Sequence, residues 1–145
     1  MSAIQITRAV KQLARLELMT TRKDGVQIII TGTERGSALF DKAQSHLLNP
    51  VRKRFCVEKN PLPPKLPLSG VSALAEYTML NPQSVTTFAF DGRVNELPGT
   101  DTLVDPDAQA EVEVCRYSPT LLSAKDGLPD LLSLWATLTD DDARI

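Results

Sequence analysis

Apolar residues recur at helical spacing in residues 2–16 of the chain. One face of the predicted helix carries Ile6, Val10, Leu13 and Ala14, and Ser2 is a suitable N-cap for it. The opposite face carries side chains that donate hydrogen bonds: Gln5, Arg8, Gln12 and Arg15. The pattern therefore predicts an amphipathic helix at the start of the chain.

A β-hairpin is expected directly after this helix. Residues 18–22 and 26–31 are strand-like runs. Between them, Lys23-Asp24-Gly25 forms the predicted turn, because Asp-Gly adopts positive φ at little cost. Arg22 and Lys23 then lie at the turn, so the hairpin has a basic tip.

The remaining pattern predicts further short helices and strands. Thr33 caps a second helix, which ends near residue 48 because Asn49-Pro50 interrupts it. Two more helices are expected at 69–80 and 128–138, and two strands at 85–90 and 110–117. This combination of elements predicts the α+β fold class.

For two of the later elements, the pattern also predicts which side chains share a face. The strand at 110–117 alternates, with Glu111, Glu113 and Cys115 on one face and Val112, Val114 and Arg116 on the other. The last helix is expected to bury four side chains: Leu131, Leu134, Trp135 and Leu138.

Prolines mark the expected domain boundary. The stretch 60–67 has four prolines in eight residues, so it can be neither a helix nor a central strand. We therefore expect a stiff linker at 59–68, which joins a domain at 1–58 to a second domain at 69–145.

The formal net charge of −2 conceals an asymmetry along the chain. Up to Lys65 there are 12 Lys and Arg against 5 Asp and Glu, a balance of +7. From Leu66 onward there are 4 against 13, a balance of −9. The basic half is typical of a DNA-binding module, but two oppositely charged halves that attract each other within the fold would give the same numbers.

Composition favours the cytoplasm and excludes a membrane span. No apolar run approaches the roughly 20 residues that a transmembrane helix needs, and no secretory signal follows Met1. Cys56 and Cys115 lie far apart in the sequence, and His46 is the only histidine. We expect two reduced thiols and no metal site.

No catalytic residue or cofactor is predicted. The chain has neither a glycine-rich phosphate loop nor a Gly-x-Ser-x-Gly motif, and Asp140-Asp141-Asp142 lacks the spaced ligands of a calcium loop. Glu111 and Glu113 share a strand face, but acid–base catalysis would require one of them to be buried. The expected class is therefore non-enzymatic.

The string Ser2-x-x-x-Ile6-Thr7-Arg8-Ala9-Val10-Lys11-x-Leu13-x-x-Leu16-x-Leu18, followed by a basic hairpin, resembles the recognition helix and wing of MarR-type winged-helix transcriptional regulators. The resemblance implies a helix in the major groove of double-stranded DNA and a wing on the phosphate backbone. Arg8 and Gln5 would pair bidentately with guanine and adenine. The implied DNA-binding residues are Ser2, Ala3, Gln5, Thr7, Arg8, Lys11, Gln12, Arg15, Arg22 and Lys23.

Two features depart from the family pattern. Glu17 stands where the family usually has glycine, just before the leucine that starts the wing. Only Met1 precedes Ser2, whereas a helix-turn-helix needs an earlier helix to support the recognition helix. We therefore expect either a shortened winged helix or a partner that covers the apolar face of this helix.

The stretches 69–90 and 111–145 resemble the C-terminal domain of uncharacterised bacterial winged-helix regulators, with Cys115 in place of a tryptophan. The resemblance implies a homodimer that binds double-stranded DNA, with a protein partner or small-molecule effector at the C-terminal domain. The alternative is a non-enzymatic interaction module, antitoxin-like or partner-binding, that does not bind DNA by itself.

Overall fold

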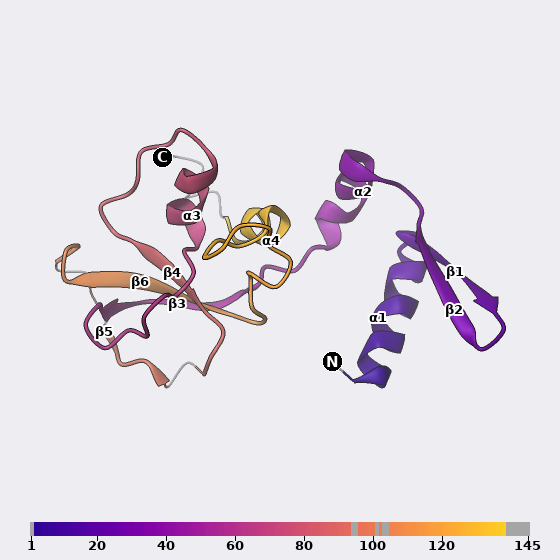
Figure 1. Ribbon diagram of the computed structural model, residues 1–145, viewed down its shortest axis with the longest axis horizontal. Coiled ribbons are helices and arrows are strands. Elements are labelled where there is room, and N and C mark those ends of the chain that lie inside the picture. Colours follow the sequence, from indigo (N-terminus) through magenta and orange to yellow (C-terminus); the bar gives the residue numbers. More distant parts are fainter. Residues whose placement is uncertain (1, 94–95, 101, 103–104, 139–145) are drawn as a thin grey trace. The chain divides into compact units, whose positions relative to one another are not determined.

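The computed structural model describes residues 2–93, 96–100, 102 and 105–138 (Figure 1). The chain divides into two units, Met1–Leu47 and Leu48–Ile145. The first unit holds helices and a β-hairpin, and the second holds a four-stranded sheet and helices. The predicted α+β class is confirmed.

The first helix, α1 (Ala3–Arg15), begins as the sequence predicts. The Ser2 hydroxyl accepts a hydrogen bond from the Gln5 backbone N–H at 3.3 Å, and the Ser2 N–H donates to Gln5 Oε1 at 2.8 Å. This reciprocal pair is a capping box, which satisfies two backbone donors that the helix leaves without a partner. Ser2 is therefore the N-cap.

The end of α1 depends on Glu17, which has a φ of +60°. The Leu18 N–H donates to the Leu13 carbonyl and the Glu17 N–H donates to the Ala14 carbonyl, both at 3.0 Å. These two bonds define a Schellman motif, whose left-handed position usually holds glycine. Glu17 adopts this left-handed conformation, and it bears the steric cost of a side chain there.

The second helix, α2 (Gly36–Ala43), starts later than predicted and continues as one 3-10 turn, η1 (Gln44–His46). Its N-cap is Arg35, so the prediction that Thr33 caps it is wrong. The Thr33 hydroxyl instead donates to the Glu17 carbonyl at 2.7 Å, and Lys42 Nζ donates to the same oxygen at 2.8 Å. These two bonds connect the segment before α2, through Thr33, and α2 itself, through Lys42, to the C-terminal end of α1.

Strands β1 (Met19–Asp24) and β2 (Gln27–Gly32) form the predicted antiparallel hairpin. Asp24 lies opposite Gln27, so the turn is Gly25-Val26 and not the predicted Lys23-Asp24-Gly25. Gly25 has a φ of +62°, as the first position of a type II′ turn requires. The shift follows from pairing, because Lys23 and Asp24 both have partners in β2.

The first unit has a small core. Leu18 is buried, and Val10, Leu13 and Ala14 of the predicted apolar face are half-buried, but Ile6 stays 49% exposed. A cavity of about 270 Å³ lies beside Leu13, Leu16 and His46. The predicted apolar face is therefore only partly covered.

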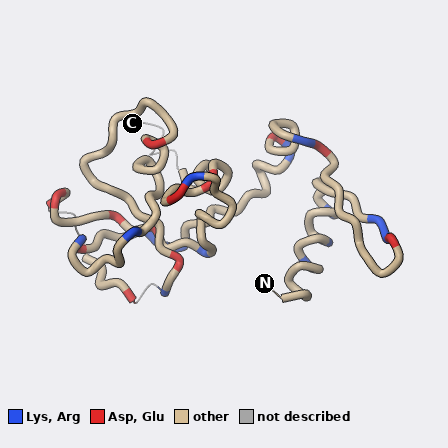
Figure 2. Tube along the Cα trace, viewed as in Figure 1, with Lys and Arg blue, Asp and Glu red and all other residues tan. Residues whose placement is uncertain are grey.

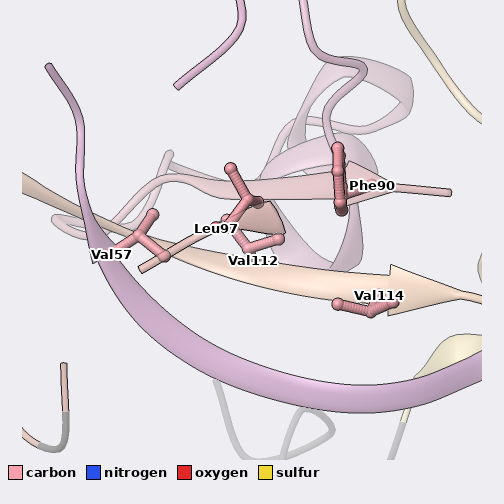
Figure 3. Close-up of a cluster of buried hydrophobic side chains, with 5 residues drawn as sticks. All are labelled: Val57, Phe90, Leu97, Val112 and Val114. Atoms are coloured by element: carbon pink, nitrogen blue, oxygen red, sulfur yellow. The ribbon is translucent and has the colours of Figure 1, made fainter. Parts of the chain in front are cut away.

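The sheet of the second unit has the strand order β4-β6-β3-β5. Its strands are β3 (Val51–Glu58), β4 (Thr87–Phe90), β5 (Gly99–Thr100) and β6 (Gln109–Cys115). Strand β6 runs antiparallel to β3 and parallel to β4. The main core cluster contains Val57, Phe90, Leu97, Val112 and Val114 (Figure 3). Strand β6 is thus central, and it is buried on both faces rather than on one.

The proline-rich stretch belongs to this second unit. Leu62 and Leu66 pack against the main core cluster, and Lys59 Nζ donates to two backbone carbonyls at 106 and 107. Strand β3 pairs with β6 from Val51 to Glu58, so 51–58 cannot belong to the first unit. The division falls at 47/48, before β3, whereas the sequence prediction placed it at 59–68.

Helices α3 (Gly70–Tyr77) and α4 (Leu131–Thr137) are shorter than predicted. Ser133, Leu134 and Thr137 form the buried face of α4, while Leu131 and Trp135 are 63% and 43% exposed. The prediction that these two are buried is wrong. Small hydroxyl side chains fill the inner face, and each forms a hydrogen bond within the unit, so their burial is tolerated.

We expect Glu17→Gly to stabilise the first unit by about 0.5–1 kcal/mol. Relief of the left-handed strain, about 1–2 kcal/mol, is partly offset by the larger unfolded-state entropy of glycine. Glu17→Ala is the matched control, since it removes the carboxylate but keeps a side chain at the same φ. Amide hydrogen exchange across α1 measures the difference, and equal protection in the two variants would contradict it.

Candidate nucleic-acid interface

Three cations form a stripe along α1. Arg8, Lys11 and Arg15 follow one another at spacings of three and four residues, so they share one helix face, and all are exposed. We call them the basic stripe. Figure 2 shows these cations as blue segments along α1. Helix α1 contains no acidic residue. The stripe therefore produces a positive potential that its own helix does not neutralise.

Other parts of the described chain do not neutralise these side chains either. Within the residues that the structure describes, neither a hydrogen bond nor an ion pair engages the side chains of the basic stripe. The first unit carries 7 Lys and Arg against 4 Asp and Glu, a net charge of +3. The cations of α1 are available to an anionic partner.

Ile4 lies on the same face as the basic stripe, although the sequence reading did not assign it there. It precedes Arg8 by four residues and Lys11 by seven, and it is 65% exposed. Helical spacing alone was the signal that could have identified it. The face thus presents an apolar methyl surface beside its cations.

Two of the predicted contact residues are occupied by local bonds. Gln5 Oε1 accepts the Ser2 N–H, so bidentate pairing with adenine, which needs that oxygen, would require the capping box to open. The Thr7 hydroxyl donates to the Ala3 carbonyl at 2.9 Å, so its proton is not free for a phosphate. In the structure both side chains thus stabilise the start of α1, and their predicted DNA contacts stay predictions.

The other predicted helix residues differ in position. Ser2 and Ala3 are exposed at the N-terminal end of α1. Gln12 is exposed but also lines the 270 Å³ cavity beside Leu13 and Leu16, so it lies at the margin of the face. Of the helix residues, the structure brings together Arg8, Lys11 and Arg15.

The two wing cations, Arg22 and Lys23, are exposed and lie in β1. They are consecutive strand residues, opposite Ile29 and Ile28, so they point to opposite faces of the hairpin. They therefore do not flank the turn as predicted, because Asp24 separates them from Gly25. A ligand that contacts both must lie along the β1 edge or at the end of the hairpin.

A buried carboxylate in the second unit is the other arrangement of chemical interest. Glu113 of β6 is 1% exposed, and its Oε1 accepts from Arg54 Nη2 of β3 at 2.7 Å. The Ser69 hydroxyl donates to its Oε2 at 2.5 Å. Gly70 has a φ of +52°, and a Cβ there would lie 3.3 Å from Oε1, so the start of α3 packs closely on the carboxylate. We call Arg54, Ser69 and Glu113 the buried polar cluster.

This cluster has the geometry of a structural ion pair. Both oxygens of Glu113 are occupied, and Arg54 also lies 3.7 Å from the half-exposed Glu111. Two cavities of the second unit, of about 300 and 460 Å³, are lined by other residues, including Leu62 and Phe88 in one and Lys65 and Lys125 in the other. Burial of Glu113 satisfies the condition that acid–base catalysis would need, but its oxygens do not line either cavity.

The cysteine thiols are held in their neutral form. Burial, with a further contribution from the Glu113 charge, raises the pKa of Cys115 to about 11. Burial and the Glu111 charge also raise the pKa of Cys56. Because the thiolate is the nucleophile and the metal ligand, neither thiol is activated at neutral pH. Among the described residues, no group of three His, Cys, Asp or Glu side chains is placed to hold a metal ion.

Comparison of the sequence with models of known protein families, with curated proteins and with solved structures found no match. The resemblance to MarR-type regulators therefore stays a prediction. In the part of the chain that the structure describes, every helix is too short or too polar to cross a lipid bilayer.

We expect Glu113→Gln to destabilise the second unit by about 1–3 kcal/mol, because it weakens charge-assisted hydrogen bonds to a buried group. Glu111→Gln is the matched control and should cost less than about 1 kcal/mol, since that pair is half-exposed and longer. Chemical denaturation followed by the fluorescence of Trp135 measures both variants. Equal shifts in the midpoint at constant slope would contradict the assignment.

Proposed function

We propose that this protein is a DNA-binding transcriptional regulator of the winged helix-turn-helix type. In this proposal α1 enters the major groove of double-stranded DNA, and the hairpin contacts the phosphate backbone. The observation that carries the proposal is the basic stripe, three exposed cations on a helix without acidic residues. Its non-enzymatic character and its location in the cytoplasm are part of the same proposal.

The dimensions of α1 support this docking mode. Arg8 and Arg15 are seven residues apart, about 10 Å along the helix axis, which corresponds to roughly three base-pair steps. Arg8 lies in the first half of the helix, nearer the end that enters the groove in helix-turn-helix proteins. We assign Arg8 to base readout and Lys11 and Arg15 to phosphates, and Ile4 is well placed to contact a thymine methyl group.

The second unit would supply regulation and partners. A cavity of about 460 Å³ is lined by Lys65, Lys125 and Asp126, a net charge of +1, which favours a small-molecule effector with an anionic group. A homodimer is part of the proposal, because regulators of this type bind two half-sites. No cofactor is required for DNA binding.

A second candidate function is that of a protein-interaction module that does not bind DNA by itself. The specific observation in its favour is the outer face of α4, where Leu131 and Trp135, four residues apart, are exposed. Exposed aromatic and aliphatic side chains of this kind are enriched at protein interfaces. The DNA measurements below distinguish the two candidates, since this module would show no binding for the wild-type chain.

Arg8→Ala should weaken binding to a preferred duplex by about 1–3 kcal/mol and reduce discrimination against single-base variants of that duplex. The preferred duplex is first selected from a random library. Arg35→Ala removes the same charge from outside α1 and the hairpin, and it should leave discrimination unchanged. An equal loss on preferred and random duplexes would assign Arg8 to the backbone instead.

The double variant Arg22→Ala, Lys23→Ala should weaken binding to all duplexes alike. Loss of two phosphate contacts makes the slope of log K against log salt concentration shallower by up to about two units. A fluorescence titration of a labelled duplex at several salt concentrations measures this slope. If the slope of the double variant equals that of the wild-type chain, the hairpin does not contact the DNA backbone.

A further inference from the structure

Strand β2 is the free edge of a two-stranded sheet. Among the residues that the structure describes, its only strand partner is β1. Ile28 and Ile30 are 61% and 46% exposed, and Val26 at the turn is fully exposed. A lone hairpin is marginally stable in water, and an exposed apolar edge strand is a template for a further strand. This edge therefore favours the addition of a strand.

The two edges of the hairpin differ in charge. Strand β1 carries Arg22, Lys23 and Asp24, whereas no residue from Gly25 to Thr33 is charged. Charged side chains on an edge strand discourage pairing, because a second strand would bring like charges together. The β1 edge is protected in this way, and the β2 edge is not.

We propose that β2 pairs antiparallel with β2 of a second copy of this chain, about a two-fold axis at Ile29. In this register Ile28 lies opposite Ile30 of the partner subunit, and Gln27 lies opposite Thr31 of the partner subunit. Apolar side chains meet apolar ones, polar side chains meet polar ones, and no like charges oppose each other. The strand is thus complementary to itself, which is the requirement of a two-fold interface.

The arrangement closes at two copies. Pairing uses both β2 edges, and the outer edges of the resulting four-stranded sheet are the two charged β1 strands. Ile28 and Ile30 of each copy lie on one face of that sheet, so four isoleucines form a contiguous apolar cluster. Arg22 and Lys23 remain at the outer edges. The proposal does not rest on DNA binding, and it is tested without DNA.

Cysteine cross-linking of the full chain tests the register. Directly opposite Cα atoms in an antiparallel pair are about 4.5–5.5 Å apart, within the range for a disulfide. Ile29→Cys chains should therefore form a disulfide-linked dimer when oxidised glutathione takes up the two electrons of the two thiols. Thr31→Cys is the matched control, because two copies of residue 31 would lie about 14 Å apart in this register.

A mixture of Gln27→Cys and Thr31→Cys chains should cross-link, although neither chain alone does so. We expect at least a tenfold difference in cross-linked product on non-reducing gels between Ile29→Cys and Thr31→Cys. The wild-type chain controls for Cys56 and Cys115. Equal yields for the two single variants would overturn the register, since they would show random collision or a different pairing.

Sedimentation velocity of the chain without added cysteines tests the interface itself. The wild-type chain should dimerise at tens of micromolar concentration, and Ile29→Lys should be monomeric, because it places two ammonium groups opposite each other. Thr20→Lys, which adds the same charge to β1, should leave the dimer intact. A monomeric wild-type chain, or an open series of larger assemblies, would overturn the proposal.

Discussion

The second unit depends on one buried carboxylate. Glu113 lies in β6, and its two oxygens accept hydrogen bonds from different elements: Arg54 in the neighbouring strand β3, and Ser69 at the start of α3. A buried carboxylate is costly unless it is paired and hydrogen-bonded, so both partners must be in place when the sheet forms. The requirement is met by the register of β3 on β6, in which Arg54 lies directly opposite Glu113, and by Gly70, whose missing side chain lets α3 start close to the carboxylate.

The first unit is stabilised differently. Among its described residues, Leu18 is the one buried hydrophobic side chain. The unit therefore depends on local hydrogen bonds: the capping box at Ser2, the Schellman motif at Glu17, and the Thr33 and Lys42 bonds to the Glu17 carbonyl. Such bonds define the ends of elements but bury little apolar surface. The exposed isoleucines of β2 and the half-covered face of α1 are consequences of this construction, and they leave the unit with surfaces that suit a partner.

The sequence was sufficient for features set by local chemistry. Helix α1 with its Ser2 cap, the hairpin, strands β4 and β6 and the α+β class could be predicted because periodicity and capping residues specify them. The features that the sequence did not predict depend on pairing between strands. The hairpin turn lies later in the sequence than predicted because Lys23 and Asp24 pair with β2. Strand β3 belongs to the second unit because it pairs with β6, more than 50 residues away in the sequence. No local signal in 51–58 identifies that partner.

The candidate interface shows the same division. The basic stripe follows from helical spacing alone, but the use of Gln5 and Thr7 in local hydrogen bonds depends on atomic geometry that a sequence pattern does not specify.

The charge asymmetry of the chain has two sources, which the structure separates. The strongest basic cluster, Arg52-Lys53-Arg54, belongs to the second unit, and Arg54 pairs there with Glu113 and Glu111 of the acidic half. Part of the asymmetry is thus an attraction within the fold. The cations of α1 have no such partners among the described residues and are exposed to solvent. The first unit therefore keeps a net charge of +3 that its own side chains do not neutralise. A polyanion would therefore recognise this smaller, unpaired share of the charge rather than the basic half as a whole.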